Sequence, residues 1–262
     1  MTEPTLFSAA FVLYVLATLV YFAGLFARRD RWARGGLALA LAGLLAHTAA
    51  LVLRTAASGH APFTNMYESL SFLSWAVVVA LAVFGRNPRL PNLGPYLMLI
   101  VVALVALASS PLMPKDATPL VPALQSYWLW LHVSVTLLGE AFFAVAFVAS
   151  LLYLGAGPEE KKERLDALAY RAVAVGFPLF TLGGLVFGMV WAYRAWGRYW
   201  AWDPKEVWSL ITWFVFALYL HTRIVMGWKG RRSAWIAIAG FLAALFTYFG
   251  VNYLLAGLHS YV

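Results

Sequence analysis

The strongest constraint on the fold is a series of eight apolar segments, each close to the length that a helix needs to cross a membrane. They lie at residues 6–27, 35–54, 66–84, 94–110, 124–154, 170–193, 206–226 and 233–256. A spanning helix needs about 20 mostly apolar residues, whereas a transmembrane β-barrel shows short alternating segments. The chain is 63% hydrophobic and 11% charged, against about 25% charged residues in soluble domains. The sequence therefore predicts an all-α, polytopic membrane protein with about eight transmembrane helices, forming a single membrane-embedded domain over residues 1–262.

Three further features exclude other classes of protein. The first apolar segment is too long for a cleavable signal peptide and has no basic region before it, so we expect it to remain as a helix. The chain has no Cys, which excludes disulfides, Cys-ligated metals, iron–sulfur clusters and thiol nucleophiles from its own residues. The net charge of +8 comes from short turns between apolar segments, and this pattern predicts contact with the lipid bilayer and no nucleic-acid partner.

The distribution of Lys and Arg predicts the orientation of the chain. Fourteen of the 19 basic residues lie in or beside the turns after the first, third, fifth and seventh apolar segments, and five lie on the opposite side. Basic residues concentrate in cytoplasmic loops. Both termini and the loop at 194–206 are therefore expected outside the cytoplasm.

The loop at 194–206 is an aromatic motif with the composition of a ligand-binding shelf. Trp196, Tyr199, Trp200 and Trp202 are interleaved with Gly, Arg, Asp and Pro, which does not make a helix face. Interfacial Trp residues often serve only as membrane anchors, but such belts spread over many spans. Here half of the twelve Trp residues gather around one loop. Offset stacking suits the apolar, polarisable face of a porphyrin.

Polar residues of the same loop have separate expected roles. Arg198 can pair with a propionate at the edge of a porphyrin. Asp203 is expected mainly to cap the next helix, with Pro204 at the first helical position, and contact with a ligand is its lesser expected role.

The five His residues are the candidate metal ligands. His132 lies near the outer end of the fifth segment and His259 just beyond the outer end of the eighth, so both can flank the aromatic loop. Two imidazoles on opposite sides of a flat platform can hold a haem iron at both axial positions. A single His at a membrane end is more often a hydrogen-bonding residue, but this pair favours ligation. His221 lies deeper, and an ionisable residue inside the membrane is a functional candidate.

Other polar and small residues rank lower as site residues. His47 is either a ligand or a satisfied core residue, and His60 lies in an outer loop. Glu140, midway through the fifth segment, marks a polar path or a helix contact. Glu68 stands at the outer start of the third segment, where the helix dipole favours it and Thr64 or Asn65 is the expected cap. Gly184 and Gly188 have the spacing of a plain helix-packing face.

Four strings of the sequence resemble a known family of haem-handling proteins. The string Trp196-Gly197-x-Tyr199-Trp200-x-Trp202-Asp203-Pro204-Lys205-Glu206 resembles the WWD signature, and its Asp-Pro-Lys-Glu continuation is similar to that of the CcsA (ResC) branch. CcsA is the membrane half of the system II cytochrome c synthase. Segments 59–70, 219–223 and 250–261 agree with the same family, so the likeness runs from about residue 45 to the C-terminus.

The resemblance implies a function and a set of partners. CcsA proteins act with a CcsB (ResB) partner to move haem b to the outer face of the bacterial inner membrane. There they attach it to the Cys-x-x-Cys-His motif of apocytochrome c by thioether bonds. Thiol-reducing proteins are further candidate partners. The chain is thus expected to be a haem-lyase subunit that is active only with CcsB.

The resemblance also assigns site residues. It implies that His132 and His259 ligate the outer haem and act in its attachment, and that His221 ligates haem inside the membrane. The second in-membrane ligand comes from a separate CcsB subunit, which we favour, or from His47.

Three other functions fit parts of the same pattern. A haem exporter or loader of the CcmC type also carries a WWD loop, although its tail after Trp-Asp differs and it has fewer spans. A b-type cytochrome electron-transfer subunit also binds haem through His pairs, but it buries these pairs inside its helix bundle. In a small-solute transporter the His residues would have no role in haem binding.

Overall fold

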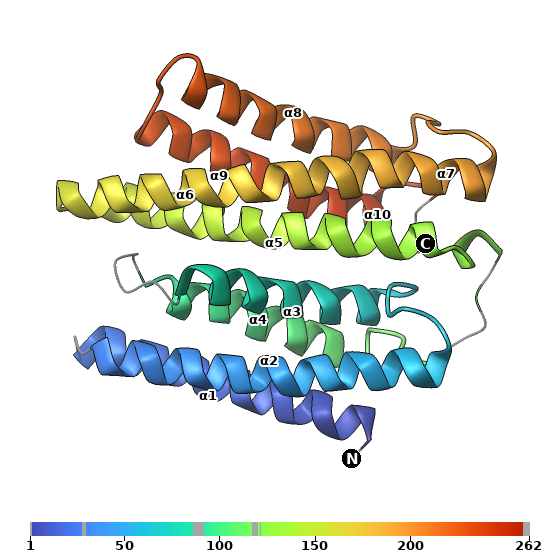
Figure 1. Cartoon of the computed structure of the whole chain (residues 1–262), viewed down its shortest axis with the longest axis horizontal. Coiled ribbons are helices and arrows are strands. Elements are labelled where there is room, and N and C mark those ends of the chain that lie inside the picture. The colour runs from blue at the N-terminus through green and yellow to red at the C-terminus, as the bar shows by residue number, and fades with distance from the viewer. Residues whose placement is uncertain (1, 28–29, 86–91, 117–119, 121, 259–262) are drawn as a thin grey trace. The chain divides into compact units, whose positions relative to one another are not determined.

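In the computed structural model seven of the eight predicted apolar segments coincide with helices to within about five residues at each end (Figure 1). The helix of the sixth segment begins at Glu159, well before the predicted start at residue 170. The structure describes residues 2–27, 30–85, 92–116, 120 and 122–258. The helices of the first half are α1 (Glu3–Ala27), α2 (Asp30–Ser58), α3 (Met66–Gly85), α4 (Gly94–Ser109) and the short η1 (Pro122–Leu124). Those of the second half are α5 (Tyr127–Gly155), α6 (Glu159–Phe180), η2 (Thr181–Phe187), α7 (Gly188–Trp196), α8 (Pro204–Ile224), α9 (Arg231–Leu245), η3 (Phe246–Gly250) and α10 (Val251–Leu254). The described residues contain no strand, which confirms the all-α prediction.

Seven helical stretches in the described residues are long and apolar enough to cross a membrane. Two of them are composite: α6, η2 and α7 run on from Glu159 to Trp196, and α9, η3 and α10 run on from Arg231 to Leu254. The fourth predicted segment forms α4, which is apolar but has only 16 residues. The protein is thus a multi-pass membrane protein, as the sequence predicts.

The chain divides into two compact units, Met1–Leu120 and Val121–Val262. In the first unit α1 packs along α2, and α3 packs along α4. Tyr14 and Tyr21 of α1 are buried against α2 at Gly43 and Gly36, where a Cβ atom would come within 2.6 and 2.7 Å of the rings. Small residues let membrane helices approach closely, so these two glycines fix how α1 lies on α2. The prediction of a single domain stays a prediction.

The second unit is built around α5, which packs against α6, η2 and α9. Its core contains Phe143, Phe180 and Phe216, all at most 1% exposed, and the rings of Phe143 and Phe216 stack with centroids 3.6 Å apart. At the end farthest from the aromatic loop, Arg223 of α8 forms a bidentate ion pair with Asp166 of α6. This unit carries the aromatic loop and three of the five His residues of the chain.

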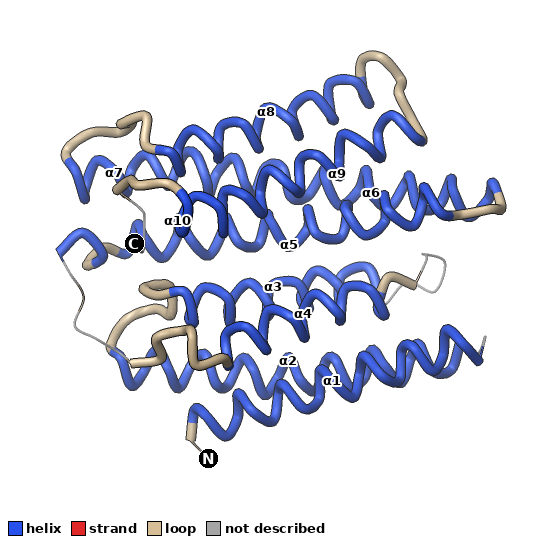
Figure 2. The backbone as a smooth tube through the Cα atoms, turned by 180° about the vertical axis from the view of Figure 1, so that it is seen from behind, coloured by secondary structure: helices blue, strands red, loops and turns tan. Residues whose placement is uncertain are grey.

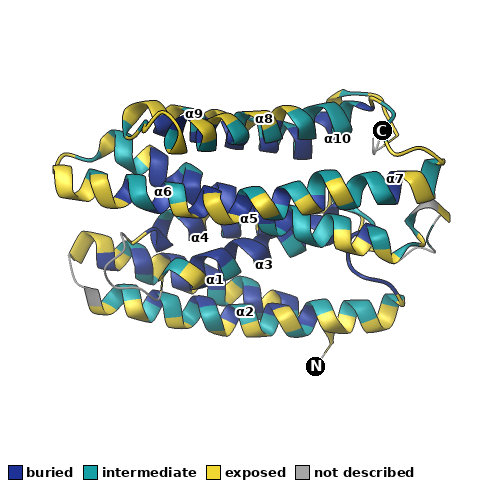
Figure 3. Ribbon diagram, turned by 45° about the horizontal axis from the view of Figure 1, so that its top comes forward, coloured by how far each residue is buried: buried dark blue, intermediate teal, exposed yellow. Residues whose placement is uncertain are grey.

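Many exposed positions on the helices, yellow in Figure 3, carry large apolar side chains. Leu19 of α1 is 60% exposed and Leu45 of α2 is 73% exposed, while their buried faces point into the first unit. A soluble protein rarely leaves so many large apolar side chains uncovered. These faces therefore suit contact with lipid.

Candidate functional site

The aromatic loop is shorter than predicted, because helix α7 continues to Trp196 and α8 begins at Pro204. Gly197 ends α7 in the left-handed conformation, with φ of 75°, which an L residue with a side chain rarely adopts. Trp202 is the one non-glycine residue in the described part of the chain with a positive φ, at 58°. This conformation is rare for an aromatic residue and marks local strain. It leaves the Trp202 indole 71% exposed, next to the edge of the Trp200 ring.

A capping box at the start of α8 holds the end of this loop. Asp203 Oδ2 accepts a hydrogen bond from Lys205 N at 3.0 Å, and Glu206 Oε2 accepts from Asp203 N at 3.2 Å. The same Glu206 oxygen accepts from Ala201 N at 2.8 Å. The predicted role of Asp203 as the cap, with Pro204 at the first position, is confirmed. The Asp-Pro-Lys-Glu string therefore fixes the loop to the helix.

The same string contacts the end of the chain, and the sequence alone did not predict this. Asp203 Oδ1 accepts a hydrogen bond from Leu258 N at 2.6 Å. Lys205 Nζ donates to Asn252 Oδ1 at 2.9 Å. Figure 2 shows the α7–α8 loop, the end of α10 and the start of α5 at one end of the second unit. His259 itself lies outside the described residues.

His132 lies on α5 at this same end, and its ring is held in one orientation. Its Nδ1 atom donates to the Gly183 carbonyl oxygen at 2.8 Å, because a carbonyl can only accept. The ring stacks on buried Trp191, with centroids 5.7 Å apart and planes 5° apart. A proton on Nδ1 leaves the lone pair of a neutral imidazole on Nε2. His132 is thus fixed in the tautomer that can bind a metal through Nε2.

Two glycines of the adjacent helix make this arrangement sterically feasible. Gly183 lies in the π-helical turn η2, and a Cβ there would collide with the backbone of Thr136 on α5. At Gly188 a Cβ would lie 3.0 Å from Cε1 and Nδ1 of His132. The predicted packing face holds for Gly188, which faces α5 at His132, but not for Gly184, whose Cβ would contact Phe180 of its own helical stretch. Gly183 makes the closest contact with α5. Isolated π-helical turns occur often at functional sites.

Three indole groups of α5, α7 and the aromatic loop have a buried N–H with no acceptor among the described residues. Trp128, Trp196 and Trp200 each bury Nε1, and none has a hydrogen-bond partner among the described residues. A buried unsatisfied donor costs about 1–3 kcal/mol. Trp128 is one turn before His132 on α5, and Trp196 contacts Trp191 edge to face. These donors could bind the oxygen atoms of a ligand.

The other predicted residues of the second unit make different contacts from those of His132. Tyr199 stacks on Tyr193 and is 55% exposed, and Arg198 is exposed. Glu140 is buried on α5, two turns beyond His132, about 12 Å along the helix axis. His221 is exposed on α8, about 25 Å along the helix from Pro204, so His132 and His221 cannot share one iron.

The predicted residues of the first unit take part in its polar contacts. His47 is fully buried, with Nδ1 3.2 Å from the Tyr14 hydroxyl and Nε2 2.8 Å from Ser71 Oγ. Both ring nitrogens are used, which favours the core interpretation of His47. His60 is buried, and its Nδ1 donates to the carbonyl of the next residue at 3.1 Å.

Glu68 forms a buried ion pair with Arg54 at 2.9 Å, and its carboxylate also accepts hydrogen bonds from Thr64. Asn65 caps the helix through its side chain, which accepts from Glu68 N at 2.9 Å. One of the two caps expected from the sequence is thus in place. These contacts give Glu68 a structural role at the start of α3.

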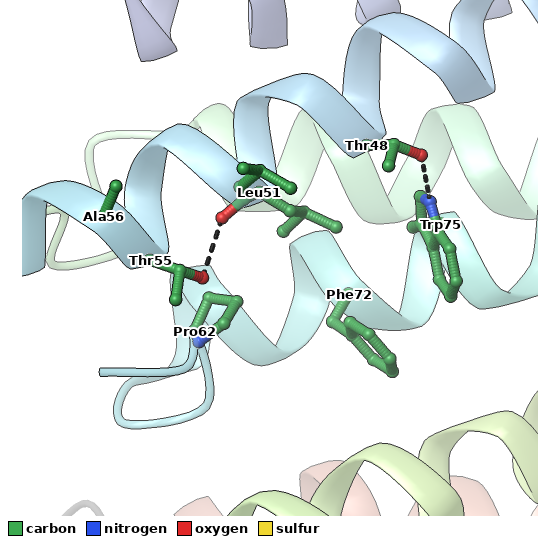
Figure 4. A pocket seen from close by; sticks show the side chains of 8 residues that line it. Thr48, Leu51, Thr55, Ala56, Pro62, Phe72 and Trp75 are labelled. Carbon is green, nitrogen blue, oxygen red and sulfur yellow. Dashed lines mark hydrogen bonds between the residues drawn. The ribbon is translucent and has the colours of Figure 1, made fainter. Parts of the chain in front are cut away.

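A pocket of about 460 Å³ opens in the first unit between α2 and α3 (Figure 4). Its lining is apolar apart from two Thr residues and the Trp75 indole, which donates to Thr48 at 2.9 Å. It contains none of the predicted site residues. Within the described residues no group of three or more His, Asp or Glu side chains could hold a metal ion.

Comparison with known proteins gives consistent results. The profile of a family described as "Cytochrome C assembly protein" matches residues 63–259. Over 226 residues the chain is 43% identical to "Cytochrome c biogenesis protein CcsA" of Chlamydomonas reinhardtii. The aligned region covers 80% of this chain and 64% of that protein. It is 37% identical to the protein of the same name from Gloeobacter violaceus, covering 97% of this chain and 94% of that one.

A solved structure shares the fold. "Cytochrome c Heme Lyase CcmF" superposes with a TM-score of 0.76 over 95% of this chain and 47% of that chain, at 20% identity. At this identity the likeness concerns the fold alone.

Proposed function

Because the chain belongs to the cytochrome C assembly protein family, we propose that it presents haem b at the outer face of the membrane and attaches it to apocytochrome c. A role in cytochrome c biogenesis follows from the family. The finer assignment depends mainly on one observation: Nδ1 of His132 donates to the Gly183 carbonyl and the ring stacks on Trp191, an arrangement that supports a ligand role for Nε2.

The residues at this end of the second unit fit a haem. The apolar faces of Trp196 and Trp200 suit a porphyrin plane. Buried indole N–H groups that have no acceptor among the described residues suit the propionates at its edge. The exposed, strained Trp202 would present a further ring on the open side. In this proposal His132 and His259 occupy the two axial positions of the iron.

For the attachment step, placing the haem vinyl groups beside the Cys thiols matters more than any reacting group supplied by this chain. Each Cys thiol of apocytochrome c adds across one haem vinyl group: the sulfur bonds to one vinyl carbon and the thiol hydrogen goes to the other, so no oxidant or reductant is consumed. Holding vinyl carbons beside thiols raises their effective concentration by several orders of magnitude. The His of the substrate motif would then replace one axial imidazole and release the product. The absence of Cys from this chain prevents a competing internal thiol.

A CcsB-like partner is part of the proposal. His221 lies on an exposed face of α8 with Phe214, Leu218 and Val225, which are 58%, 51% and 69% exposed. These positions recur every three or four residues, which is the pattern of a helix-packing seam. A transmembrane helix of the partner on this seam would bring the second ligand of an in-membrane haem to His221. Thiol-reducing proteins would keep the Cys residues of apocytochrome c reduced.

The proposed location is the bacterial inner membrane. The bias of Lys and Arg supports an orientation with the aromatic loop and both termini on the periplasmic side. A reporter fused after Val262 should be active only in the periplasm.

The deciding experiment uses His132→Gly co-produced with the CcsB partner and an apocytochrome c. We expect holocytochrome c to fall to background and to recover when imidazole is added, because free imidazole can fill the vacated axial position. The unaltered protein with and without imidazole is the control. Full yield from His132→Gly without imidazole would refute axial ligation by this residue.

A second experiment separates the synthase from a CcmC-type exporter. The purified complex is mixed with reduced haem and an apocytochrome peptide that carries Cys-x-x-Cys-His. Mass spectrometry should show a covalent haem–peptide adduct. Haem transfer without a covalent adduct would favour the exporter.

A further inference from the structure

Arg54 of α2 and Glu68 of α3 form an ion pair beside the loop that joins these two helices. Arg54 Nε donates to Glu68 Oε1 at 2.9 Å, and Nη2 lies 2.9 Å from the same oxygen atom. Only the Nε contact has the geometry of a hydrogen bond, so the buried Nη2 has no acceptor among the described residues. A buried donor that lacks an acceptor is costly, and more so when it is charged. The Arg54 guanidinium therefore needs a further partner.

A cavity of about 10 Å³ lies next to this pair, inside the first unit. Its polar lining comes from Glu3, Arg54, Tyr67, Glu68 and Ser71, and Ala50 lines it as well. About 10–15 Å³ is enough to hold one water molecule, which needs two to four polar partners. Both the size and the lining of the cavity therefore suit a single water.

Ser71 connects the cavity with His47. Ser71 Oγ lies 2.8 Å from His47 Nε2, and His47 Nδ1 lies 3.2 Å from the Tyr14 hydroxyl. Ser71 is 3% exposed, and the other two residues are 0% exposed. His47 lies about 16 Å along the axis of α2 from the helix end at Ser58. A hydroxyl group can donate one hydrogen bond and accept two, so Ser71 can contact a water molecule and the imidazole together.

The opposite side of the cavity leads to polar groups that are partly exposed. Tyr67, whose ring centroid lies 5.2 Å from the Arg54 guanidinium carbon, donates its hydroxyl hydrogen to Glu3 Oε1 at 2.8 Å. Thr64 donates to Glu68 Oε2 through its backbone N at 2.9 Å and its Oγ1 at 2.8 Å. Glu3 and Thr64 are both partly exposed. Polar groups thus continue from the surface of the first unit to His47, and the cavity separates the two parts of this series.

We propose that the cavity binds one ordered water molecule, and that solvent protons exchange with the His47 ring through it. The water would accept a hydrogen bond from Arg54 Nη2 and form another with Ser71 Oγ, which contacts His47 Nε2. Hydrogen bonds that are linked in this way strengthen one another in a low-dielectric interior. Exchange replaces one ring proton by one solvent proton, so the ring keeps its charge. The inference involves no haem and goes beyond the proposed function.

The test times the exchange of the His47 ring proton in the purified complex with the CcsB partner. The complex, with isotope-labelled His, is moved to deuterated buffer, and the ring N–H signals are followed by solid-state NMR. The His47 signal is the one that is missing from His47→Asn. We expect this signal to decay while the backbone amide signals of the helix interiors persist. A His47 signal that persists as long as those amides would overturn the proton route.

Ala50→Val separates the water from the rest of the series. Ala50 is 2% exposed and lines the cavity, so two added methyl groups fill the space of the water and leave Ser71 and His47 in place. We expect the exchange of His47 to be lost over the time in which it is complete in the unaltered protein. Ala49→Val is the matched control, because it makes the same change at the preceding residue of α2, which does not line the cavity. His47 should exchange in Ala49→Val as it does in the unaltered protein.

Unaltered exchange in Ala50→Val would overturn the inference, and equal slowing in Ala49→Val would contradict a role specific to the cavity. A second measurement tests the site even when Ala50→Val does not fold. In a cryo-EM map of the unaltered complex that resolves buried waters, we expect a water within about 3.2 Å of both Arg54 Nη2 and Ser71 Oγ. A map that shows other buried waters and none at this position would also overturn the inference.

Discussion

Replacing Gly188 by Ala adds one methyl group directly against the imidazole of His132. The new Cβ would lie 3.0 Å from both Cε1 and Nδ1 of the ring. Ordinary contacts between non-bonded heavy atoms of this kind are about 3.5–4.0 Å. The imidazole must therefore move by a few tenths of an ångström. Gly188 has helical backbone angles, so the substitution itself introduces no backbone strain.

The size of the effect follows from the hydrogen bond that this movement stretches. The Nδ1–oxygen distance to Gly183 is 2.8 Å, and movement of the ring away from the new methyl group disturbs this hydrogen bond. Losing a group that orients a metal-binding His costs about 10- to 100-fold in affinity. Helix propensity acts in the opposite direction, since Ala is favoured over Gly by about 1 kcal/mol. The variant should fold at least as well and bind haem less tightly.

Gly184→Ala is the control, because it gains the same helix propensity without touching His132. Its Cβ would lie 3.4 Å from the Phe180 ring of the same helical stretch, which is an ordinary contact. Both variants are purified with the partner, and haem content and the Soret band are measured together with thermal stability. We expect haem retention in Gly188→Ala to be at least tenfold lower than in Gly184→Ala. Equal haem retention would refute the role assigned to the Gly183–His132 hydrogen bond.

Three further predictions test other parts of the molecule. Trp128→Phe removes an indole N–H and keeps an aromatic ring, so haem retention should fall about fivefold; an unchanged Soret titration would contradict a ligand-binding role for this donor. His47→Ala should lower the free energy of unfolding by about 2–4 kcal/mol, seen as a lower melting temperature, and rescue of haem content by imidazole would instead favour the ligand interpretation. Asp166→Asn breaks the buried pair with Arg223 and should cost about 3 kcal/mol, whereas Glu160→Gln at an exposed pair should cost less than 1 kcal/mol; similar melting temperatures would contradict this difference.

Local features of the sequence determined the helices and the cap of α8. Hydropathy over about 20 residues predicts a spanning helix because lipid leaves a backbone no other way to satisfy its polar groups. Asp203 and Pro204 are adjacent to the helix that they start, so their role also depends only on neighbouring residues. The string that contains them carried the family resemblance, which the match over residues 63–259 confirms.

The tertiary structure decided which residues hold the His132 ring and which hold residues 252–258 to the start of α8. His132 and Gly183 are 51 positions apart in the chain, and Asp203 and Leu258 are 55 positions apart. Such contacts depend on how one helix rotates and slides along another, and a sequence pattern with a period of one helical turn does not specify this. For the same reason the spacing of Gly184 and Gly188 suggested one shared packing face, whereas the rotation of the helix places Gly188, and not Gly184, against α5. The sequence determined which side chains are available near the aromatic loop, and helix packing determined which of them hold one another in place.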